Sequence, residues 1–485
     1  MVQPSREEYL KLSTEFNVVP VYEEVVADLE TPIAAFKKLG KCPSFLLESV
    51  SGGEFLGRYS FIGFDPFLDF RVKGDRVSLT MDGETEVSTK KSPIEVLTGI
   101  FARFRGPRVE GLPRFYGGGV GYFGYDLVRH IERLPCATLD DTGVDDCHLI
   151  FTKIVLVFDH VRRRLAVVVN TRPGSNPEVS YNEAETRIKA ILSELQEPVS
   201  MNWEIPPPGT NSPVAANLKK EDFMQAVDRA KEYIRAGDIL QVVLSQRFSQ
   251  HFSGDTFEVY RRLRTINPSP YLYYLNFGDS VVAGSSPEML IRVEDGVIRT
   301  RPIAGTRPRG KDAGEDHLFA EDLLADPKER AEHIMLVDLG RNDLGRVSVP
   351  GTVRVTEFMN VEKYSHVIHI VSEVQGQLSP GYTALSALAA SFPAGTVSGA
   401  PKIRAMEIIE ELEPTRRGIY AGAVGYFSFT GNLDTCITIR TIVFHGGKAY
   451  VQAGAGIVAD SDREREFTET INKAQALLTT LQGGA

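Results

Sequence analysis

Two apolar runs on either side of a polar stretch predict a β-hairpin in the first third of the chain. Residues 154–158 and 165–169 consist of Val, Ile, Leu, Phe and Ala, and residues 159–164 between them are mostly charged. Short runs of this kind that are bounded by turns are typical of strands. Residues up to about 195 alternate similar runs with turns, so we predict a β-rich N-terminal part.

The pattern changes near residue 200. Residues 197–220 contain the sequence Pro-Pro-Pro-Gly at 206–209, which is typical of a linker or an extended crossing segment. From Leu218 onward the apolar residues recur at helical spacing, and Gly237 is placed to end that helix. The residues expected on its buried face are Phe223, Val227, Ala230 and Ile234.

The remaining strand-like runs come in consecutive groups instead of alternating strictly with helices. They include residues 280–283, 290–293, 353–355 and 421–429. This order favours an α/β protein of the α+β type, in which large antiparallel sheets form a sandwich with helices packed outside. We divide the chain into residues 1–200, a linker at 201–217, and residues 218–485.

One short sequence occurs twice. Residues 119–123 read Gly-Val-Gly-Tyr-Phe and residues 423–427 read Ala-Val-Gly-Tyr-Phe. The two segments are consistent with an internal duplication or with two similar strands that close similar sheets, and five residues do not decide between these explanations.

Length and composition narrow the class of protein. A chain of 485 residues is too long for one ordinary core, so several domains or one large fold are expected. The net charge of −10 argues against nucleic acid or an anionic membrane as a partner. No apolar run approaches the ~18 residues of a spanning helix, and residues 1–16 lack the apolar core of a secretory signal. Four scattered cysteines without a CxxC pair fit a reduced, cytoplasmic setting.

Two predicted helices each carry an acidic pair at i and i+3. The pairs are Glu329 with Glu332, and Glu466 with Glu469, and Lys473 follows the second pair. Residues at this spacing share a helix face, so each helix directs its carboxylates to one side. If the two faces meet, their oxygens suit Mg²⁺, which takes one or two carboxylates and keeps several waters. The alternative is that each pair lies on a solvated face.

Further polar groups lie in apolar or Gly-rich surroundings. His369 lies in a strand-like run, where it is either a hydrogen-bonded core residue or a general acid or base. Residues 394–402 and 454–456 form small-residue loops that aim backbone N–H groups at an anion, or that are plain turns. Arg440 follows a strand pattern and suits a carboxylate clamp or a sheet edge.

Together these segments resemble the chorismate-utilising enzymes, over residues 219–477. The motifs that carry the resemblance occur in the expected order: Arg-Pro-Ile-Ala-Gly-Thr at residues 301–306, then residues 332–344, 395–402, 434–440 and 454–473. The resemblance implies that the C-terminal part is catalytic. It also implies that residues 1–200 are regulatory.

Within that family the sequence is most similar to the anthranilate synthase component I branch. Ala304 stands where some aminodeoxychorismate synthases carry a nucleophilic lysine, and Gln241 stands where the water-adding members have a lysine base. The resemblance also implies a tryptophan effector site, formed by Ser49 together with Pro270, Tyr271 and Leu272. The alternative within the family is aminodeoxychorismate synthase component I.

The resemblance assigns roles to individual residues. Glu332 and Glu469 would hold Mg²⁺; Glu288 would protonate the leaving hydroxyl, and His369 would abstract a proton in the second step. Thr396 would orient the substrate or the metal-bound carboxylate. The residues expected to bind or line chorismate are Gly305, Thr306, Tyr420, Arg440, Gly454, Ala455, Gly456 and Lys473.

The implied reaction converts chorismate and ammonia into anthranilate and pyruvate, in tryptophan biosynthesis. No cysteine of this chain lies in the context of a glutaminase nucleophile, so ammonia is expected from a separate glutamine amidotransferase subunit. Such a pair of components is expected to assemble as a heterotetramer.

Overall fold

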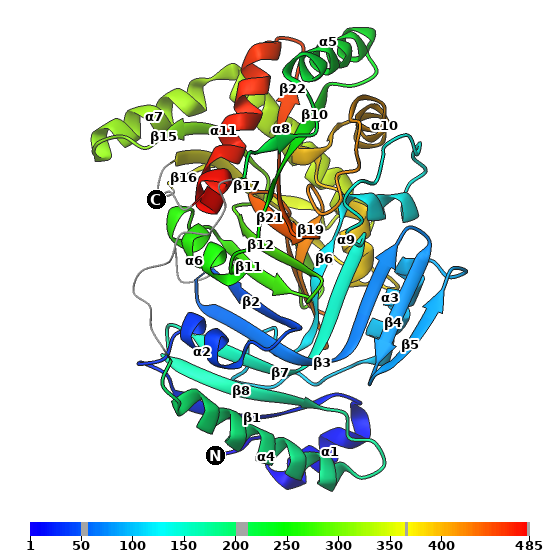
Figure 1. The fold of residues 1–485 in the computed structure, drawn as a ribbon, viewed down its shortest axis with the longest axis vertical. Coiled ribbons are helices and arrows are strands. Elements are labelled where there is room, and N and C mark those ends of the chain that lie inside the picture. The colour runs from blue at the N-terminus through cyan, green and yellow to red at the C-terminus, as the bar shows by residue number, and fades with distance from the viewer. Residues whose placement is uncertain (50–56, 200–211, 364–366, 483–485) are drawn as a thin grey trace.

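The computed structural model describes residues 1–49, 57–199, 212–363 and 367–482. Most of the predicted linker therefore lies outside the described residues. Within the described part, every pairing between the named strands is antiparallel, as predicted for this fold class. The strands form two sheets, and helices cover their outer faces (Figure 1).

The first sheet begins at an N-terminal strand and ends at a strand from the middle of the chain. Its order is β1-β8-β7-β3-β2-β11-β12-β21-β22-β10, and the short strands β9 and β18 both pair with β10. The bounds are β1 Val19–Val26, β2 Ser44–Glu48, β3 Tyr59–Lys73, β7 Cys147–Asp159, β8 Arg164–Thr171, β9 Ala215–Ala216, β10 Gln241–His251, β11 Tyr271–Asn276, β12 Ser280–Ser286, β18 Gly399–Ala400, β21 Thr441–His445 and β22 Lys448–Ile457.

The second sheet shares the long strands β3 and β7 with the first. Its order is β5-β4-β3-β7-β6-β19-β20-β13-β14-β17, where β15 lies on the same edge of β17 as β14 and β16 lies on the other edge. The bounds are β4 Arg76–Met81, β5 Glu84–Ser88, β6 Gly118–Phe123, β13 Met289–Glu294, β14 Val297–Thr300, β15 Ile303–Pro308, β16 Arg354–Lys363, β17 Val367–Gln377, β19 Ala423–Ser428 and β20 Leu433–Ile437.

Both sheets draw strands from the two sides of residue 200. Strand β2 pairs with β11, and β6 pairs with β19. The repeated sequence lies at the second of these contacts, because Gly121 faces Gly425 and the two similar segments pair with each other. A Cβ on Gly121 would lie 1.9 Å from the carbonyl oxygen of His148, so the close strand packing requires glycine there. Strands from the two sides of residue 200 are thus interleaved in space. The division into a regulatory part and a catalytic part remains a prediction about function.

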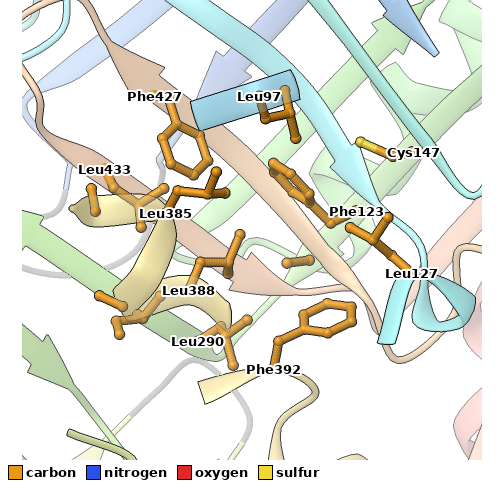
Figure 2. Close-up of a cluster of buried hydrophobic side chains, with 14 of the residues drawn as sticks. Leu97, Phe123, Leu127, Cys147, Leu290, Leu385, Leu388, Phe392, Phe427 and Leu433 are labelled. Atoms are coloured by element: carbon orange, nitrogen blue, oxygen red, sulfur yellow. The ribbon is translucent and has the colours of Figure 1, made fainter. Parts of the chain in front are cut away.

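Three hydrophobic layers hold the sandwich together. Between the sheets lie side chains such as Phe45, Val120, Tyr273 and Val424, which are all at most 1% exposed. The outer face of the first sheet packs against α1, α2, α4, α6 and α11, and that of the second packs against α3, α8 and α9 (Figure 2). The helix bounds are α1 Arg6–Glu15, α2 Pro32–Leu39, α3 Pro93–Arg103, α4 Pro177–Gln196, α5 Lys220–Ala236, α6 Thr256–Ile266, α7 Ala313–Ala325, α8 Pro327–Gly345, α9 Ala384–Ser391, α10 Lys402–Leu412 and α11 Arg463–Gln482, with short 3-10 helices η1 Tyr125–His130 and η2 Gly395–Val397.

Local predictions from periodicity are confirmed. Strands β7 and β8 form the predicted hairpin, in which Phe158 pairs with Leu165. Helix α5 buries Phe223 and Val227, and it ends at Gly237, whose φ of +84° is the left-handed conformation that glycine adopts without strain. No helix in the described part of the chain is both long and apolar enough to cross a membrane.

Candidate functional site

A cavity of about 720 Å³ lies where the second sheet meets helix α11 and the segment that follows α6. Six of the predicted catalytic, substrate-binding and metal-binding residues line it, and they come from five separate segments of the chain. They are Glu288, Thr306, His369, Arg440, Glu469 and Lys473, and Ala304 lines it as well. Sequence positions far apart are thus brought to one cavity, which is the arrangement expected of an active site.

A bulge between β15 and β17 fixes the position of His369. The register of the two strands shifts between Ala304 and Thr306, so that Gly305 is the extra residue. His369 Nδ1 lies 2.9 Å from the carbonyl oxygen of Gly305 and 3.1 Å from Thr306 Oγ1. Because a carbonyl oxygen only accepts, Nδ1 carries the proton, and a neutral ring has its lone pair on Nε2. Burial lowers the pKa of His369 and nearby Arg440 lowers it further, so the ring is neutral at pH 7.

Gly305 has a φ of +69°, and a Cβ there would lie 3.0 Å from Leu323 Cδ1 and 3.1 Å from Glu329 Oε2. We expect Gly305→Ala to lower the free energy of unfolding by about 1–3 kcal/mol, because it adds left-handed strain and crowding. The strained bulge should also move the carbonyl that orients His369, and kcat should fall. Urea denaturation and steady-state kinetics check the two effects, with Gly83→Ala as the control: its φ is +91°, and a Cβ there would meet nothing within 4 Å. A Gly305→Ala protein as stable and as active as the Gly83→Ala protein would contradict the expectation.

Glu288 lies in the same cavity between β12 and β13. Burial raises its pKa to about 7, although the Thr396 hydroxyl and the cations of Arg440 and Lys473 act in the opposite direction. A carboxyl group with this pKa still carries its proton in an appreciable fraction of molecules at neutral pH, so it can act as a general acid. Thr396 in η2 lies beside Glu288 in a smaller adjoining cavity. The cavity therefore contains an acid with a raised pKa and a base with a lowered pKa.

Arg440 reaches the cavity from a strained backbone position just after β20. Its φ is +50°, and its carbonyl oxygen accepts a hydrogen bond of 3.1 Å from the Ser285 amide. Its Nη1 lies 3.5 Å from Asn267 Oδ1, at the C-cap of α6. Asn267 and Asn472 line the cavity but were not assigned to it from the sequence. The bidentate geometry of a guanidinium suits a substrate carboxylate.

The predicted acidic pairs lie on α8 and α11, near enough that charges on one helix act on carboxyl groups of the other. Burial raises the pKa of Glu332, and the charges of Glu329 and Glu469 raise it further. In the same way, burial raises the pKa of Glu466, and Glu469 adds to the effect. Lys473 Nζ lies 2.7 Å from Glu469 Oε1. Within the described ranges, no three His, Cys, Asp or Glu side chains are grouped so that they could hold a metal ion.

Residues 454–456 lie beside the cavity, where the Gly454 carbonyl oxygen accepts a 3.0 Å hydrogen bond from Lys473 Nζ. Strand β21 pairs with β22 only as far as Val451, so beyond it one edge of β22 has no strand partner among the described residues. Ala455 is fully buried in the core below α5 and α10, so Gly454 and Gly456 point to the opposite face. A Cβ on Gly454 would lie 2.7 Å from the Tyr420 hydroxyl. Burial raises the pKa of Tyr420 to about 12, so its hydroxyl remains a donor.

A second cavity gathers the four predicted effector residues, Ser49, Pro270, Tyr271 and Leu272. The Ser49 hydroxyl is buried and has no hydrogen-bond partner among the described residues. Pro270 lines both this cavity and the catalytic one. The two cavities therefore share a wall.

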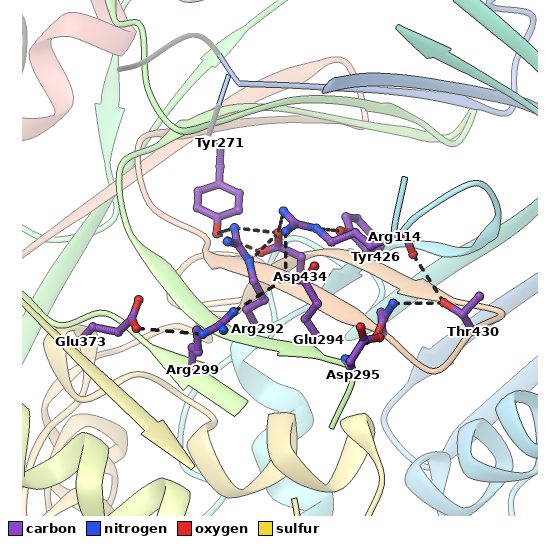
Figure 3. A network of polar contacts seen from close by, with 11 residues as sticks. Arg114, Tyr271, Arg292, Glu294, Asp295, Arg299, Glu373, Tyr426, Thr430 and Asp434 are labelled. Atoms are coloured by element: carbon purple, nitrogen blue, oxygen red, sulfur yellow. Dashed lines mark hydrogen bonds and ion pairs between the residues drawn. The ribbon is translucent and has the colours of Figure 1, made fainter. Parts of the chain in front are cut away.

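A charged network forms one side of the second cavity and was not predicted (Figure 3). Asp434 lies 3.1 Å from Arg114 Nη2 and 2.9 Å from Arg292, and it accepts a 2.9 Å hydrogen bond from the Tyr271 hydroxyl. The three charged residues come from three different parts of the sequence, and only Asp434 belongs to a motif singled out above, that of residues 434–440. Only the strand pairings bring them together.

Comparison with known proteins extends these observations. The sequence profile of the chorismate binding enzyme family matches residues 43–479. A protein named anthranilate synthase component 1 from Acetivibrio thermocellus is 50% identical over 491 aligned residues, which cover 99% of each chain. A protein of the same name from Pseudomonas aeruginosa is 48% identical over 98% of this chain and 97% of its own length.

Solved structures show the same fold. The crystal structure of anthranilate synthase component I from Streptococcus pneumoniae has a TM-score of 0.79 at 38% identity, and the match covers 94% of this chain and 99% of that one. A menaquinone-specific isochorismate synthase from Escherichia coli has a TM-score of 0.72 at 21% identity, with 98% of each chain covered. The second likeness is one of fold alone.

Proposed function

Because this chain belongs to the chorismate-binding enzyme family, as a relative of the anthranilate synthase component 1 proteins over its whole length, we propose that its main cavity converts chorismate and ammonia into anthranilate and pyruvate. The observation that carries the proposal is the pair of oppositely shifted groups in that cavity. Glu288 has a raised pKa and His369 has a lowered one. A two-step reaction that needs first an acid and then a base matches this pair.

In the first step ammonia forms a bond to C2 of the ring as the C4 hydroxyl leaves. Glu288 gives its proton to that hydroxyl, which departs as water. A carboxyl group with a pKa of about 7 retains enough of its acid form for this task at neutral pH. Ala304 lines the cavity and has no nucleophilic atom, so ammonia adds to the ring directly.

In the second step His369 removes the proton at C2, and the C–O bond to the enolpyruvyl group breaks. The ring becomes aromatic, and the departing group takes up a proton to become pyruvate. The hydrogen bond from Nδ1 to Gly305 orients the ring, and the lone pair on Nε2 makes it a base.

The substrate's two carboxylates need separate partners. Arg440 lines the cavity, and the Tyr420 hydroxyl and the unpaired edge of β22 at Gly454 and Gly456 lie beside it; each offers hydrogen-bond donors that suit the enolpyruvyl carboxylate. Thr306 and Lys473 line the remainder of the space, Gly305 adjoins Thr306 in the bulge of β15, and Thr396 orients the group beside Glu288.

The ring carboxylate would bind Mg²⁺ held by Glu332 and Glu469. These two side chains are close enough for the charge of Glu469 to raise the pKa of Glu332, so a cation between them relieves their repulsion. Two carboxylates fit an ion that keeps most of its waters. When bound, Mg²⁺ would act as a template and Lewis acid that favours departure of the C4 hydroxyl.

The second cavity would bind tryptophan as a feedback effector. Its walls are largely apolar, and the Ser49 hydroxyl and the two arginines near Asp434 offer donors for an amino-acid carboxylate. The relatives are named component 1, which implies a second component. We propose that this partner is a glutamine amidotransferase that supplies ammonia, in a heterotetramer that serves tryptophan biosynthesis.

Product analysis tests the proposal. The purified chain, given chorismate, Mg²⁺ and an ammonium salt near pH 8.5, should release anthranilate and pyruvate in equal amounts, and tryptophan should suppress both. Without Mg²⁺, or with glutamine in place of ammonium, the chain alone should make neither product. An amino-chorismate product without pyruvate would instead indicate an aminodeoxychorismate synthase. No consumption of chorismate at all would refute the catalytic assignment.

A further inference from the structure

A buried ion pair lies behind the substrate-facing side of the site. Arg417 and Glu413 have side chains that are 1% and 5% exposed, and they form two parallel contacts, Nη2 to Oε1 at 2.6 Å and Nε to Oε2 at 2.9 Å. The residues are four apart but follow the end of α10, so they are not a helix-surface pair. A buried pair of this kind is weak evidence for stability, because desolvation offsets much of the attraction.

The guanidinium of Arg417 also bonds two backbone carbonyls from different elements. Its Nη1 donates to the carbonyl of Val397 at 2.7 Å, and its Nη2 donates to the carbonyl of Val243 at 2.6 Å. Val397 is the neighbour of Thr396 in η2, and Val243 is the register partner of Gly456. The Arg417 side chain thus joins η2, which carries Thr396, to β10, which pairs with β22 at Gly454 and Gly456.

Glu413 extends the same connection. Its Oε1 accepts hydrogen bonds from the amide and the hydroxyl of Ser245, at 2.8 and 2.9 Å. Ser245 is the register partner of Gly454, and its hydroxyl also accepts a 2.8 Å bond from Gln452 on β22. Gly454 and Gly456 are therefore each paired with a residue of β10, Ser245 or Val243, whose backbone is hydrogen-bonded to the ion pair.

The aromatic ring of Tyr420 also contacts the ion pair. The centre of the Arg417 guanidinium lies 5.7 Å from the Tyr420 ring centroid and 4.8 Å from that of Tyr125. These distances are within the range of cation–π contact, so the phenol is held from behind while its hydroxyl faces Gly454.

We propose that Arg417, fixed by Glu413, is a positioning residue that sets the geometry of the chorismate carboxylate site through Val243, Val397 and Tyr420. It touches no substrate itself. The inference rests on the proposed function, since it specifies how that site is held. Its consequence is specific: loosening Arg417 should weaken chorismate binding more than it weakens the use of ammonia.

The test compares Arg417→Lys with Arg71→Lys. Lysine keeps the charge but cannot bond Glu413 and both carbonyls at once. Arg71 is the control, because it also forms two contacts with one carboxylate, that of Asp69 at 2.9 and 3.3 Å, and it lines neither the catalytic nor the effector cavity. We expect Arg417→Lys to raise the chorismate KM roughly tenfold or more while the ammonia KM changes less than about twofold. Arg71→Lys should lower the melting temperature with an unchanged chorismate KM.

Two results would overturn the proposal: a wild-type chorismate KM in Arg417→Lys, or an equal rise of KM in Arg71→Lys. If Arg417→Lys does not fold, Glu413→Asp takes its place, because it keeps both charges and withdraws the carboxylate from Ser245. Calorimetric titration of the wild-type protein with chorismate separates this proposal from the proposed function. A wild-type chain that binds no chorismate refutes the function, and a wild-type chain that binds it normally leaves the variants to decide the role of Arg417.

Discussion

A His369→Ala protein should consume chorismate and ammonia but release almost no pyruvate. In the mechanism proposed above, the lone pair on Nε2 acts as the base for the second step alone, and Glu288, not His369, assists the departure of the C4 hydroxyl. Removing a positioned general base typically costs about 10²–10⁴ in rate, so anthranilate formation should fall by that factor. The aminated, non-aromatic intermediate should accumulate instead.

Chromatography of a quenched reaction, with pyruvate measured in parallel, checks this expectation. His445→Ala is a suitable control, because His445 bonds the Asp279 carbonyl away from the catalytic cavity. Equal loss of both steps would mean that His369 supports substrate binding and is not the base. Anthranilate production near the wild-type rate would remove His369 from the mechanism.

A Glu288→Gln protein should lose the first step. Glutamine has nearly the same shape but cannot give a proton to the leaving hydroxyl, so chorismate consumption should fall by about 10²–10⁴. The wild-type kcat/KM, measured at a fixed concentration of free ammonia, should decrease as the pH rises above about 7, because Glu288 loses its proton there. That decrease should be absent from the residual activity of Glu288→Gln. If the decrease of kcat/KM at high pH persists unchanged in the variant, it reports the titration of another group.

Glu288→Gln, which should lower the activity, should raise the stability of the folded protein at alkaline pH. The pKa of Glu288 is raised in the folded state above its ordinary value of 4.5, so the folded protein binds more protons and wild-type stability falls as the pH rises from 4.5 to about 7. Glutamine avoids the buried charge. Thermal unfolding should therefore show Glu288→Gln above the wild type at pH 8 and close to it at pH 4. A lower melting temperature at pH 8 would contradict this account of the shifted pKa.

Short-range patterns predicted the elements well because their signals are local. The apolar spacing in α5 and its final glycine fix a helix without reference to the remainder of the chain. The hairpin of β7 and β8 follows from two runs and one turn. Six candidate residues line the catalytic cavity, and four of them came from the ordered motifs: Thr306, Arg440, Glu469 and Lys473.

Long-range geometry was not predictable in the same way. The bulge at Gly305 depends on the register between β15 and β17, which no residue in the motif specifies by itself. Glu413 and Arg417 have the spacing of an exposed helical pair, yet the helix ends before them and they are buried. Arg114 and Asp434 meet only because β6 and β19 bring distant segments together. Each of these features depends on which strands pair, and that information is spread over the whole sequence.

The two strands shared by both sheets have a consequence for how the chain folds. Strands β3 and β7 can pair with each other and with β2 and β6 early in synthesis, but the second edges of β2 and β6 must wait for β11 and β19, which are made much later. Contacts between such distant segments slow folding, and until they form the early strands present unpaired edges. A nascent chain that has reached residue 200 therefore has open strand edges at β2 and β6. The late strand β19 completes the half of the protein that was synthesised first.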